Sequence, residues 1–401
     1  MKNILNSIEC LNREECCGCT ACYQKCPKKA IKMEENEEGF LYPVIDKEKC
    51  INCGLCKKVC PQLDSINVVD NNYPKAYAMY NTNNEELIKS SSGGIFSVIA
   101  NEILNKQGII YGASYDKDLN VNHIRIIDVN NLDKLRGSKY VQSNINDTYK
   151  LAENDLKAGK KVLFSGTPCQ INGLKKYLNK DYENLYTCDL VCHGVPSQKL
   201  FHKYIDYLSN KFKSKVIEYN FRLKKNGHWG LLAEAITQNG KKHIINPDFD
   251  PYYSNFLESS TYRENCYSCK YASYNRVSDI TLADYWGIAS IHPDFYKKEG
   301  CSLILINTKK GEELITRIDK NLKKIPTKID LASKKNKNLK RPSIRNRKRD
   351  SIYKDIENLN ANEYIKKKLT VSYTFKKIIK MCIPNEIMSI IKKVKGKIKN
   401  D

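Results

Sequence analysis

The spacing of apolar and polar residues divides the chain beyond residue 75 into short strands and amphipathic helices. One helix is predicted at 95–105, and another follows residue 170, where Ile171, Leu174, Tyr177 and Leu178 share a face. Strand-like runs lie at 76–80, 108–111, 121–126, 160–164 and 185–192. This alternation predicts a mixed α/β core. Within 215–245, the turn signals Asn226-Gly227 and Asn239-Gly240 predict hairpins.

Residues 61–74 combine Pro, Asp and Asn and are expected to link this core to a separate N-terminal module. No stretch reaches the roughly 18–20 consecutive apolar residues of a membrane span. The first ten residues lack the apolar run of a secretory signal. A cytoplasmic location is therefore expected.

The chain has 17 cysteines, and in a reducing compartment clustered thiols bind metal more often than they form disulfides. Residues 16–27 and 50–61 both follow the C-x-x-C-x-x-C-x-x-x-C-P pattern of bacterial ferredoxins. Three thiolates of one run bind one 4Fe–4S cluster, and the fourth is directed to the other cluster. The first cluster is thus assigned Cys16, Cys19, Cys22 and Cys60, and the second Cys50, Cys53, Cys56 and Cys26. Structural zinc sites are the alternative, although they rarely use this doubled pattern.

A third group of cysteines lies beyond residue 150. Cys266 and Cys269 form a C-x-x-C pair, whereas Cys169 and Cys192 follow predicted strands beside Gly and Pro. Because ligands gather at strand ends in α/β proteins, these four thiols are candidates for one more cluster. On the residues alone, burial as small apolar side chains is an equal alternative.

The net charge of +23 is concentrated at the C-terminal end, where residues 331–401 carry 21 Lys and Arg against 6 Asp and Glu. Residues 370–399 mix apolar residues with Lys in a pattern typical of a helix that lies on an anionic membrane surface. This pattern predicts peripheral contact with the inner face of the membrane. A solvated helix and a docking arm for an acidic electron-transfer partner are the alternatives. No nucleic-acid partner is expected, because the basic run lacks a DNA or RNA motif.

The order of the motifs resembles a known family. After the two cysteine runs come Ser92-Gly93-Gly94, then 136–143 (RGSKYVQS), 159–170 (GKKVLFSGTPCQ), the C-x-x-C pair and 282–287 (LADYWG). Over residues 10–320 this order resembles the beta-subunit family of coenzyme F-420 hydrogenases and dehydrogenases, with an N-terminal two-cluster ferredoxin domain.

That resemblance implies a core that binds FAD and its own 4Fe–4S cluster. It implies Cys169, Cys192, Cys266 and Cys269 as cluster ligands, with Cys188 competing with Cys169 for the fourth place. Flavin contacts are implied for Ser92, Gly93, Gly94, Lys139, Tyr140, Gly166 and Thr167. The glycines would let backbone N–H groups approach a pyrophosphate, and Lys139 would neutralise its charge. A plain loop before a helix is an equal interpretation of Gly93-Gly94 alone. No G-x-G-x-x-G follows a strand, which argues against a Rossmann-type site.

The expected fold class is α+β, with a ferredoxin-like module at 1–63, a flavin-binding core at 75–150 and 151–325, and a basic helical tail at 330–401. The expected function is an iron–sulfur flavin oxidoreductase that couples two-electron chemistry to one-electron transfer. One use would be a ferredoxin-linked reductase of cell-envelope or polysaccharide metabolism, acting on a small-molecule or glycan-linked substrate. The alternatives are an electron-transfer subunit of a larger complex and a metal-stabilised binding protein.

Two aspects of the chemistry stay open at the level of sequence. Use of coenzyme F-420 depends on an organism that makes it. His193, Asp284 and His228 are candidates for acid–base catalysis by polarity only, and a lone His is more often structural, so none is assigned.

Overall fold

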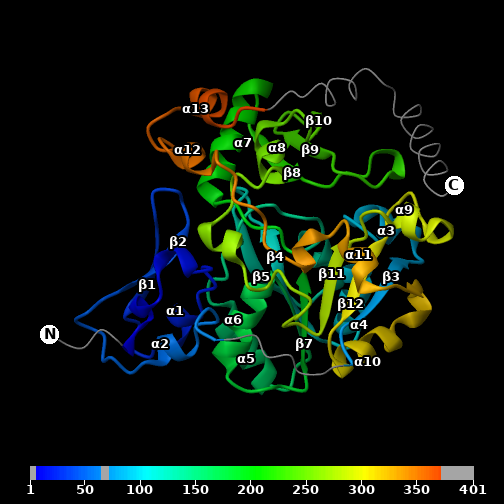
Figure 1. Ribbon diagram of the computed structural model, residues 1–401, viewed down its shortest axis with the longest axis horizontal. Helices are drawn as coiled ribbons and strands as arrows, with labels where there is room; N and C mark the ends of the chain where they lie inside the picture. Colours follow the sequence, from blue (N-terminus) through cyan, green and yellow to red (C-terminus); the bar gives the residue numbers. More distant parts are fainter. Residues whose placement is uncertain (1–5, 65–71, 372–401) are drawn as a thin grey trace.

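The computed structural model describes residues 6–64 and 72–371, which form a core with a smaller module at one end (Figure 1). The core is built on an eight-stranded mixed sheet. In spatial order, its strands are β13 (Leu322–Pro326), β3 (Lys75–Asn81), β12 (Ser302–Ile306), β11 (Ile280–Asp284), β7 (Leu185–Leu190), β6 (Val162–Ser165), β4 (Ile109–Tyr115) and β5 (Val121–Ile126). The expected core segments 75–150 and 151–325 thus share one sheet.

Helices cover both faces of this sheet because its central strands are apolar on both sides. β4, β6, β7 and β11 run parallel, and residues 162–164 are all buried. On one face, Ile110 and Leu163 pack with α4 (Ile95–Leu104) and α10 (Lys309–Arg317). On the other, Val162 and Phe164 pack with α5 (Thr148–Lys157) and α6 (Pro168–Leu178). Such double coverage is typical of parallel strands.

A smaller antiparallel sheet contains the hairpins predicted in 215–245. β9 (Ala233–Thr237) and β10 (Lys242–Ile245) are joined at Asn239-Gly240, as expected. β8 (Val216–Asn220) also pairs with β9, but Asn226-Gly227 is not a tight turn between them. It lies within a longer connection that forms the 3₁₀ turn η5 (Lys225–Gly227). This connection also carries Arg222, whose side chain forms an ion pair with Asp284 of the main sheet.

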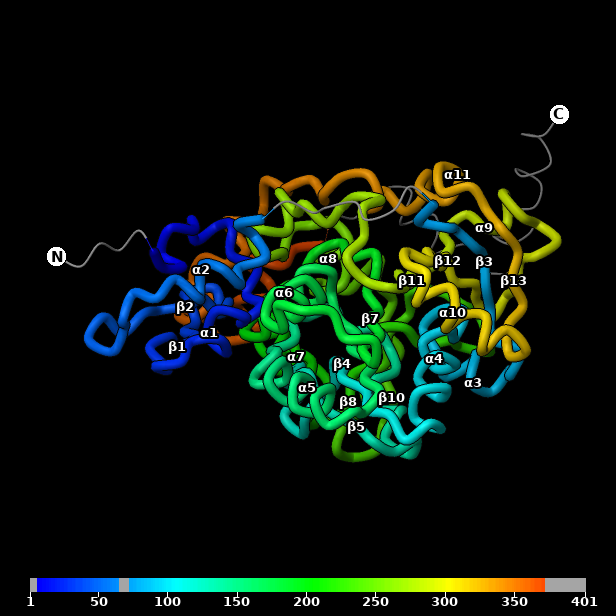
Figure 2. Tube along the Cα trace, turned by 90° about the horizontal axis from the view of Figure 1, so that it is seen from below, coloured from blue at the N-terminus to red at the C-terminus, as the bar shows by residue number. Residues whose placement is uncertain are grey.

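The N-terminal module lies at one end of the core in both views (Figures 1 and 2). It consists of the 3₁₀ turns η2 (Ile8–Cys10) and η3 (Arg13–Glu15), the short helices α1 (Ala21–Lys25) and α2 (Leu55–Lys58), and an antiparallel hairpin of β1 (Ile31–Glu35) and β2 (Leu41–Ile45). Each cysteine run encloses one helix, since α1 follows Cys19 and α2 follows Cys53. The module therefore has the repeated construction that the doubled motif predicts.

The other helices surround the core and connect it to the module. They are α3 (Asn84–Lys89), α7 (Gln198–Phe212), α8 (Pro251–Leu257), α9 (Ile288–Ile291), α11 (Ile329–Ser333), α12 (Arg349–Tyr353) and α13 (Ala361–Lys368), with the 3₁₀ turns η4 (Val129–Lys134), η6 (Glu264–Ser268), η7 (Pro293–Phe295), η8 (Asp319–Asn321) and η9 (Lys337–Leu339). None of the helices in the described ranges is long and apolar enough to cross a bilayer. The segment 372–401, which contains most of the predicted membrane-surface helix at 370–399, lies outside the described residues.

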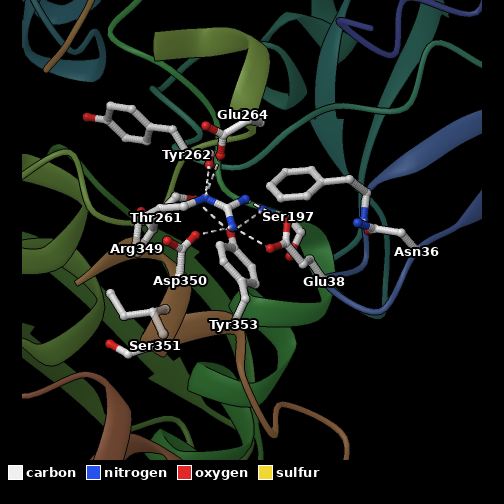
Figure 3. Close-up of polar contacts among 12 residues, drawn as sticks. Asn36, Glu38, Ser197, Thr261, Tyr262, Glu264, Arg349, Asp350, Ser351 and Tyr353 are labelled. Atoms are coloured by element: carbon white, nitrogen blue, oxygen red, sulfur yellow. Dashed lines mark hydrogen bonds and ion pairs between the residues drawn. The ribbon is translucent and has the colours of Figure 1, made fainter. Parts of the chain in front are cut away.

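The segment that contains α12 ties the module to the core. Arg349 is buried and forms an ion pair with Glu38 of the module, while its Nε donates to the carbonyl of Tyr262 at 3.1 Å (Figure 3). The rings of Phe40 and Tyr353 also lie against each other, with centroids 5.5 Å apart. Apolar contact and a paired charge thus fix the position of the module.

Candidate functional site

A cavity of about 400 Å³ opens at the carboxyl edge of the parallel strands. It lies where β6, β7 and β11 end, which is the edge where open α/β sheets bind ligands. Its lining residues come from 90–97, 135–143, 165–170, 189–195 and 282–286, together with Gly112, Ala113, His123, Arg222, Leu231, Phe256, Leu257, Ser302 and Asn336. The volume is within the range of small-molecule sites.

The Ser-Gly-Gly loop forms one wall of this cavity, although Gly93 does not line it. Ser92 and Gly94 face the cavity, and Gly94 opens α4 with a φ of 77° that favours glycine. The N–H of Gly93 instead donates to the Ser302 hydroxyl at 2.9 Å. A Cβ at Gly93 would lie 2.5 Å from the Met79 carbonyl oxygen. Gly93 therefore allows the loop to approach β3 and β12, and its N–H is not free for the phosphate contact expected from the sequence.

The segment with Lys139 and Tyr140 supplies a positive charge to the cavity. Among the described residues, the Lys139 ammonium donates only to carbonyls, those of Arg136 at 2.8 Å and Gly137 at 3.2 Å. Burial lowers the pKa of Lys139 to about 7. Within the described ranges no carboxylate forms an ion pair with it, so an anionic ligand would be favoured beside this side chain.

The loop between β6 and α6 contributes Gly166 and Thr167. Thr167 caps α6 in a capping box, in which its own N–H donates to the Gln170 side chain at 2.9 Å. The Thr167 hydroxyl lies 3.1 Å from the Cys169 sulfur. One short loop thus places cavity-lining atoms directly beside a candidate cluster ligand.

His123 is a cavity residue that the sequence analysis missed. Its Nδ1 lies 2.7 Å from the Ser143 hydroxyl and its Nε2 lies 2.9 Å from the Ser165 carbonyl oxygen. Burial lowers the pKa of His123 to about 4, so the ring is neutral at physiological pH. In the sequence, the only hint that His123 lines the cavity is its place in the strand predicted at 121–126.

Two of the three polar candidates for acid–base catalysis line the cavity. Asp284 is held by Arg222, at 2.6 Å, and by the indole N–H of Trp229, at 3.0 Å. His193 also lines the cavity, and burial lowers its pKa. His228 is not among the lining residues. Asp284 is therefore an ion-pair partner in the cavity wall.

The second ferredoxin run brings its predicted ligands together. Cys26, Cys50, Cys53 and Cys56 line one small cavity of about 20 Å³ in the module. This is the set assigned to the second cluster from the motif spacing. Of these four, Cys53 is exposed, so the cavity lies near the surface of the module.

The set assigned to the first cluster also gathers on the core side of the module. Burial, followed by the nearby thiols of Cys16 and Cys60, raises the pKa of Cys22. The thiol of Cys19 is close enough to that of Cys22 to be affected by its charge. No three Cys, His, Asp or Glu side chains among the described residues converge closely enough to bind a single metal ion.

The candidate ligands of the third cluster lie between the first cysteine run and the cavity. Burial, followed by Cys192 and Cys269, raises the pKa of Cys266. Cys169 lies near Cys269 and also against Cys17. Cys192 lines the cavity as well. These four thiols are thus brought together from three loops.

Cys188 lies apart from this group. It is buried in β7 and packs in the aliphatic cluster on the α4 face. The charged groups that act on it are Asp189 and Asp279, which follow burial in raising its pKa. Of the two candidates for the fourth ligand, the structure places Cys169 with the others. Cys17, the thiol of the first run that the motif does not use, adjoins both Cys169 and Cys19.

Comparison with known proteins identifies the family of several regions of the chain. Residues 159–330 match the family described as the C terminus of the beta subunit of coenzyme F420 hydrogenase/dehydrogenase. Residues 15–63 and 42–121 each match a 4Fe-4S dicluster domain. A search of curated proteins finds no match.

Among solved structures, a chain of the F420-reducing NiFe hydrogenase complex from Methanosarcina barkeri, studied by xenon derivatisation, is similar. It is 19% identical, with a TM-score of 0.46, and the similarity covers 67% of this chain and 88% of that one. From the matched domains, this chain is an iron–sulfur protein whose N-terminal 4Fe–4S dicluster domain precedes a region, residues 159–330, that matches the C terminus of the coenzyme F420 hydrogenase/dehydrogenase beta subunit.

Proposed function

We propose that the chain is an iron–sulfur flavin oxidoreductase that holds FAD in the cavity and a third 4Fe–4S cluster beside it. The observation that carries this proposal is the shared loop at 166–169. Gly166 and Thr167 line the cavity, and Cys169 belongs to the third group of thiols. A ligand in the cavity and a cluster on these thiols would therefore be neighbours.

The residues present fit a flavin dinucleotide. Lys139, which pairs with no carboxylate in the described part of the chain, offers a charge to a phosphate, and the 90–94 loop presents Ser92 to the same cavity. Tyr140 and Trp286 contribute aromatic surface. Bound FAD would supply two-electron chemistry, and iron–sulfur clusters exchange single electrons. Neutral His123 and the Arg222–Asp284 pair would orient the ligand without adding net charge.

The thiol groups suggest the order of electron transfer. The thiols assigned to the second cluster lie near the surface, those assigned to the first lie towards the core, and those proposed for the third lie between the first set and the cavity. Electrons would pass along this series in either direction.

An acidic electron-transfer protein, such as a ferredoxin, fits the outer end of this series. Close in the chain to the cysteines of the small cavity in the module, exposed lysines outnumber acids. The lysines are Lys28, Lys29, Lys47, Lys49, Lys57 and Lys58, and the nearby acids are Asp46 and Glu48. Exposed Ile51 and Cys53 provide the contact surface at the centre. Complementary charge would steer such a partner to the cluster.

Anaerobic purification followed by analysis of iron, sulfide and flavin tests the proposal. Three clusters and one flavin predict about twelve irons and one FAD per chain. Zinc in place of iron, or flavin-free protein after reconstitution with FAD, would reject it.

A non-catalytic electron-transfer subunit is the second candidate. The observation that favours it is the matched family, which is named for the beta subunit of a larger enzyme. A reductase assay with purified chain distinguishes the two, with reduced ferredoxin as donor and coenzyme F420 among the acceptors. Turnover by the isolated chain supports an independent reductase, whereas activity only with added subunits supports the alternative.

A further inference from the structure

Two buried arginines lie where the ferredoxin module meets the core, and they differ in how their charge is balanced. Arg349 is 2% exposed and has the carboxylates of Glu38 and Glu264 beside it (Figure 3). Arg263 is 1% exposed. Within residues 6–64 and 72–371, no carboxylate forms an ion pair with Arg263. A buried charge without an opposite charge is costly, so another counter-charge is expected.

The neighbours of Arg263 hold it firmly but carry no formal charge of their own. Its Nε donates to the Cys16 carbonyl at 2.6 Å, and its Nη2 donates to the Leu41 carbonyl at 3.0 Å. Its Nη1 donates to the side-chain oxygen of Gln142 at 3.3 Å. The guanidinium also lies 4.1 Å from the centre of the Tyr42 ring. Its position is therefore fixed from both the module and the core.

The ionisable groups that act most strongly on Arg263 are three thiols and a tyrosine. They are Cys16, Tyr42, Cys17 and Cys266. Cys16 is assigned to the first cluster, and Cys266 to the third. The guanidinium thus lies at the step where an electron would leave the module for the core.

We propose that Arg263 is the counter-cation of this step and stabilises the reduced state of the adjacent clusters. A cluster bound by four thiolates is negatively charged, and one added electron increases that charge by one without forming a bond. A fixed cation in a water-poor interface stabilises the added charge more than an exposed lysine would. Arg263 is thus a positioning residue, and its charge raises the reduction potential of the adjacent clusters. This inference rests on the cluster assignments proposed above.

The test is a redox titration of the holoprotein monitored by electron paramagnetic resonance. Arg263→Gln should disfavour one-electron reduction of the first cluster about tenfold, which corresponds to about 59 mV towards negative potential. Arg263→Lys retains the charge, so the potential of the first cluster should stay close to its wild-type value. Arg349→Gln is the matched control, because the groups that act most strongly on this buried arginine are carboxylates and a tyrosine and not thiols, and it should lower thermal stability without a comparable shift.

Unchanged potentials in iron-replete Arg263→Gln would overturn the proposal. If that variant loses iron, Gln142→Glu is the second test, because a carboxylate there would neutralise the guanidinium in place. The proposal then requires a negative shift, and an unchanged potential would overturn it. Wild-type protein with about eight irons would reject the third cluster but leave the test on the first cluster valid.

Discussion

The ion pair between Arg222 and Asp284 allows a quantitative test of the cavity wall. Their side chains are 2% and 14% exposed. Arg222 also donates to the carbonyl of Ser91 and the hydroxyl of Tyr140, both at 3.2 Å. The substitution Arg222→Met keeps much of the volume but leaves Asp284 buried without its counter-charge.

Removal of one partner from a buried pair costs about 3–5 kcal/mol, because the remaining charge is desolvated. For a domain of this size, that loss lowers the melting temperature by on the order of 10 °C. Since Ser91 and Tyr140 lose their anchor, the affinity for FAD should fall as well. Thermal unfolding followed by circular dichroism measures the first effect, at matched iron and flavin content.

Two further variants make the result interpretable. Asp284→Asn in the Arg222→Met background removes the unpaired charge and should recover part of the stability, since Asn can still accept from Trp229. Lys49→Met breaks an exposed pair with Asp46, whose side chains are 61% and 32% exposed, and should leave the melting temperature close to that of the wild type. If Arg222→Met lowers the melting temperature no more than Lys49→Met does, the interpretation of Arg222 and Asp284 as a buried charge pair is wrong.

Three other predictions concern the ligand, the third cluster and the partner. Burial lowers the pKa of Lys139 to about 7, so above that pH an anion must bind together with a proton, and its affinity should fall up to about tenfold per pH unit. Calorimetric titration with FAD from pH 6 to 9 measures this slope, which Lys139→Met should abolish. Cys169→Ser should lose about four irons per chain and Cys188→Ser none, as measured by iron analysis. Replacing Lys57 and Lys58 by Glu should slow reduction by ferredoxin several-fold to about tenfold at low salt, as measured by stopped flow.

Each of these has an outcome that would contradict it. A flat pH profile in the wild type would mean that Lys139 does not contact the anion. Equal iron loss from Cys169→Ser and Cys188→Ser would contradict the choice of Cys169 as the fourth ligand of the third cluster. For the partner, Lys320 and Lys323 provide the control, because they are exposed lysines on another part of the chain. The same slowing after their replacement by Glu would argue against a local docking surface.

The sequence was sufficient for features whose chemistry fixes short spacings. The 4Fe–4S dicluster domain is such a case, because three thiolates in one loop must reach one cluster. The helix after Thr167 is another, because Pro168 and the capping box act within four residues. Strands β3 to β7 and helices α4 and α6 also appear where periodicity predicts them, whereas β11, β12 and β13 were not predicted.

Features that depend on partners far apart in the chain could not be obtained in this way. Gly93 was expected to approach a phosphate, but its missing Cβ makes room for the Met79 carbonyl. A glycine pair in a sequence does not distinguish these two uses. Arg222 and Asp284 lie 62 positions apart, so nothing local indicates their pairing. Likewise, Arg263 contacts the carbonyl of Cys16 across 247 positions, and only folding brings them together.

An anaerobic reductive titration of the holoprotein tests the central claim most directly. Three clusters that accept one electron each and a flavin that accepts two predict uptake of about five electrons per chain, with bleaching of the flavin absorbance. Uptake of about two electrons, with no flavin signal after incubation with FAD, would contradict the account, because it would leave only the ferredoxin clusters.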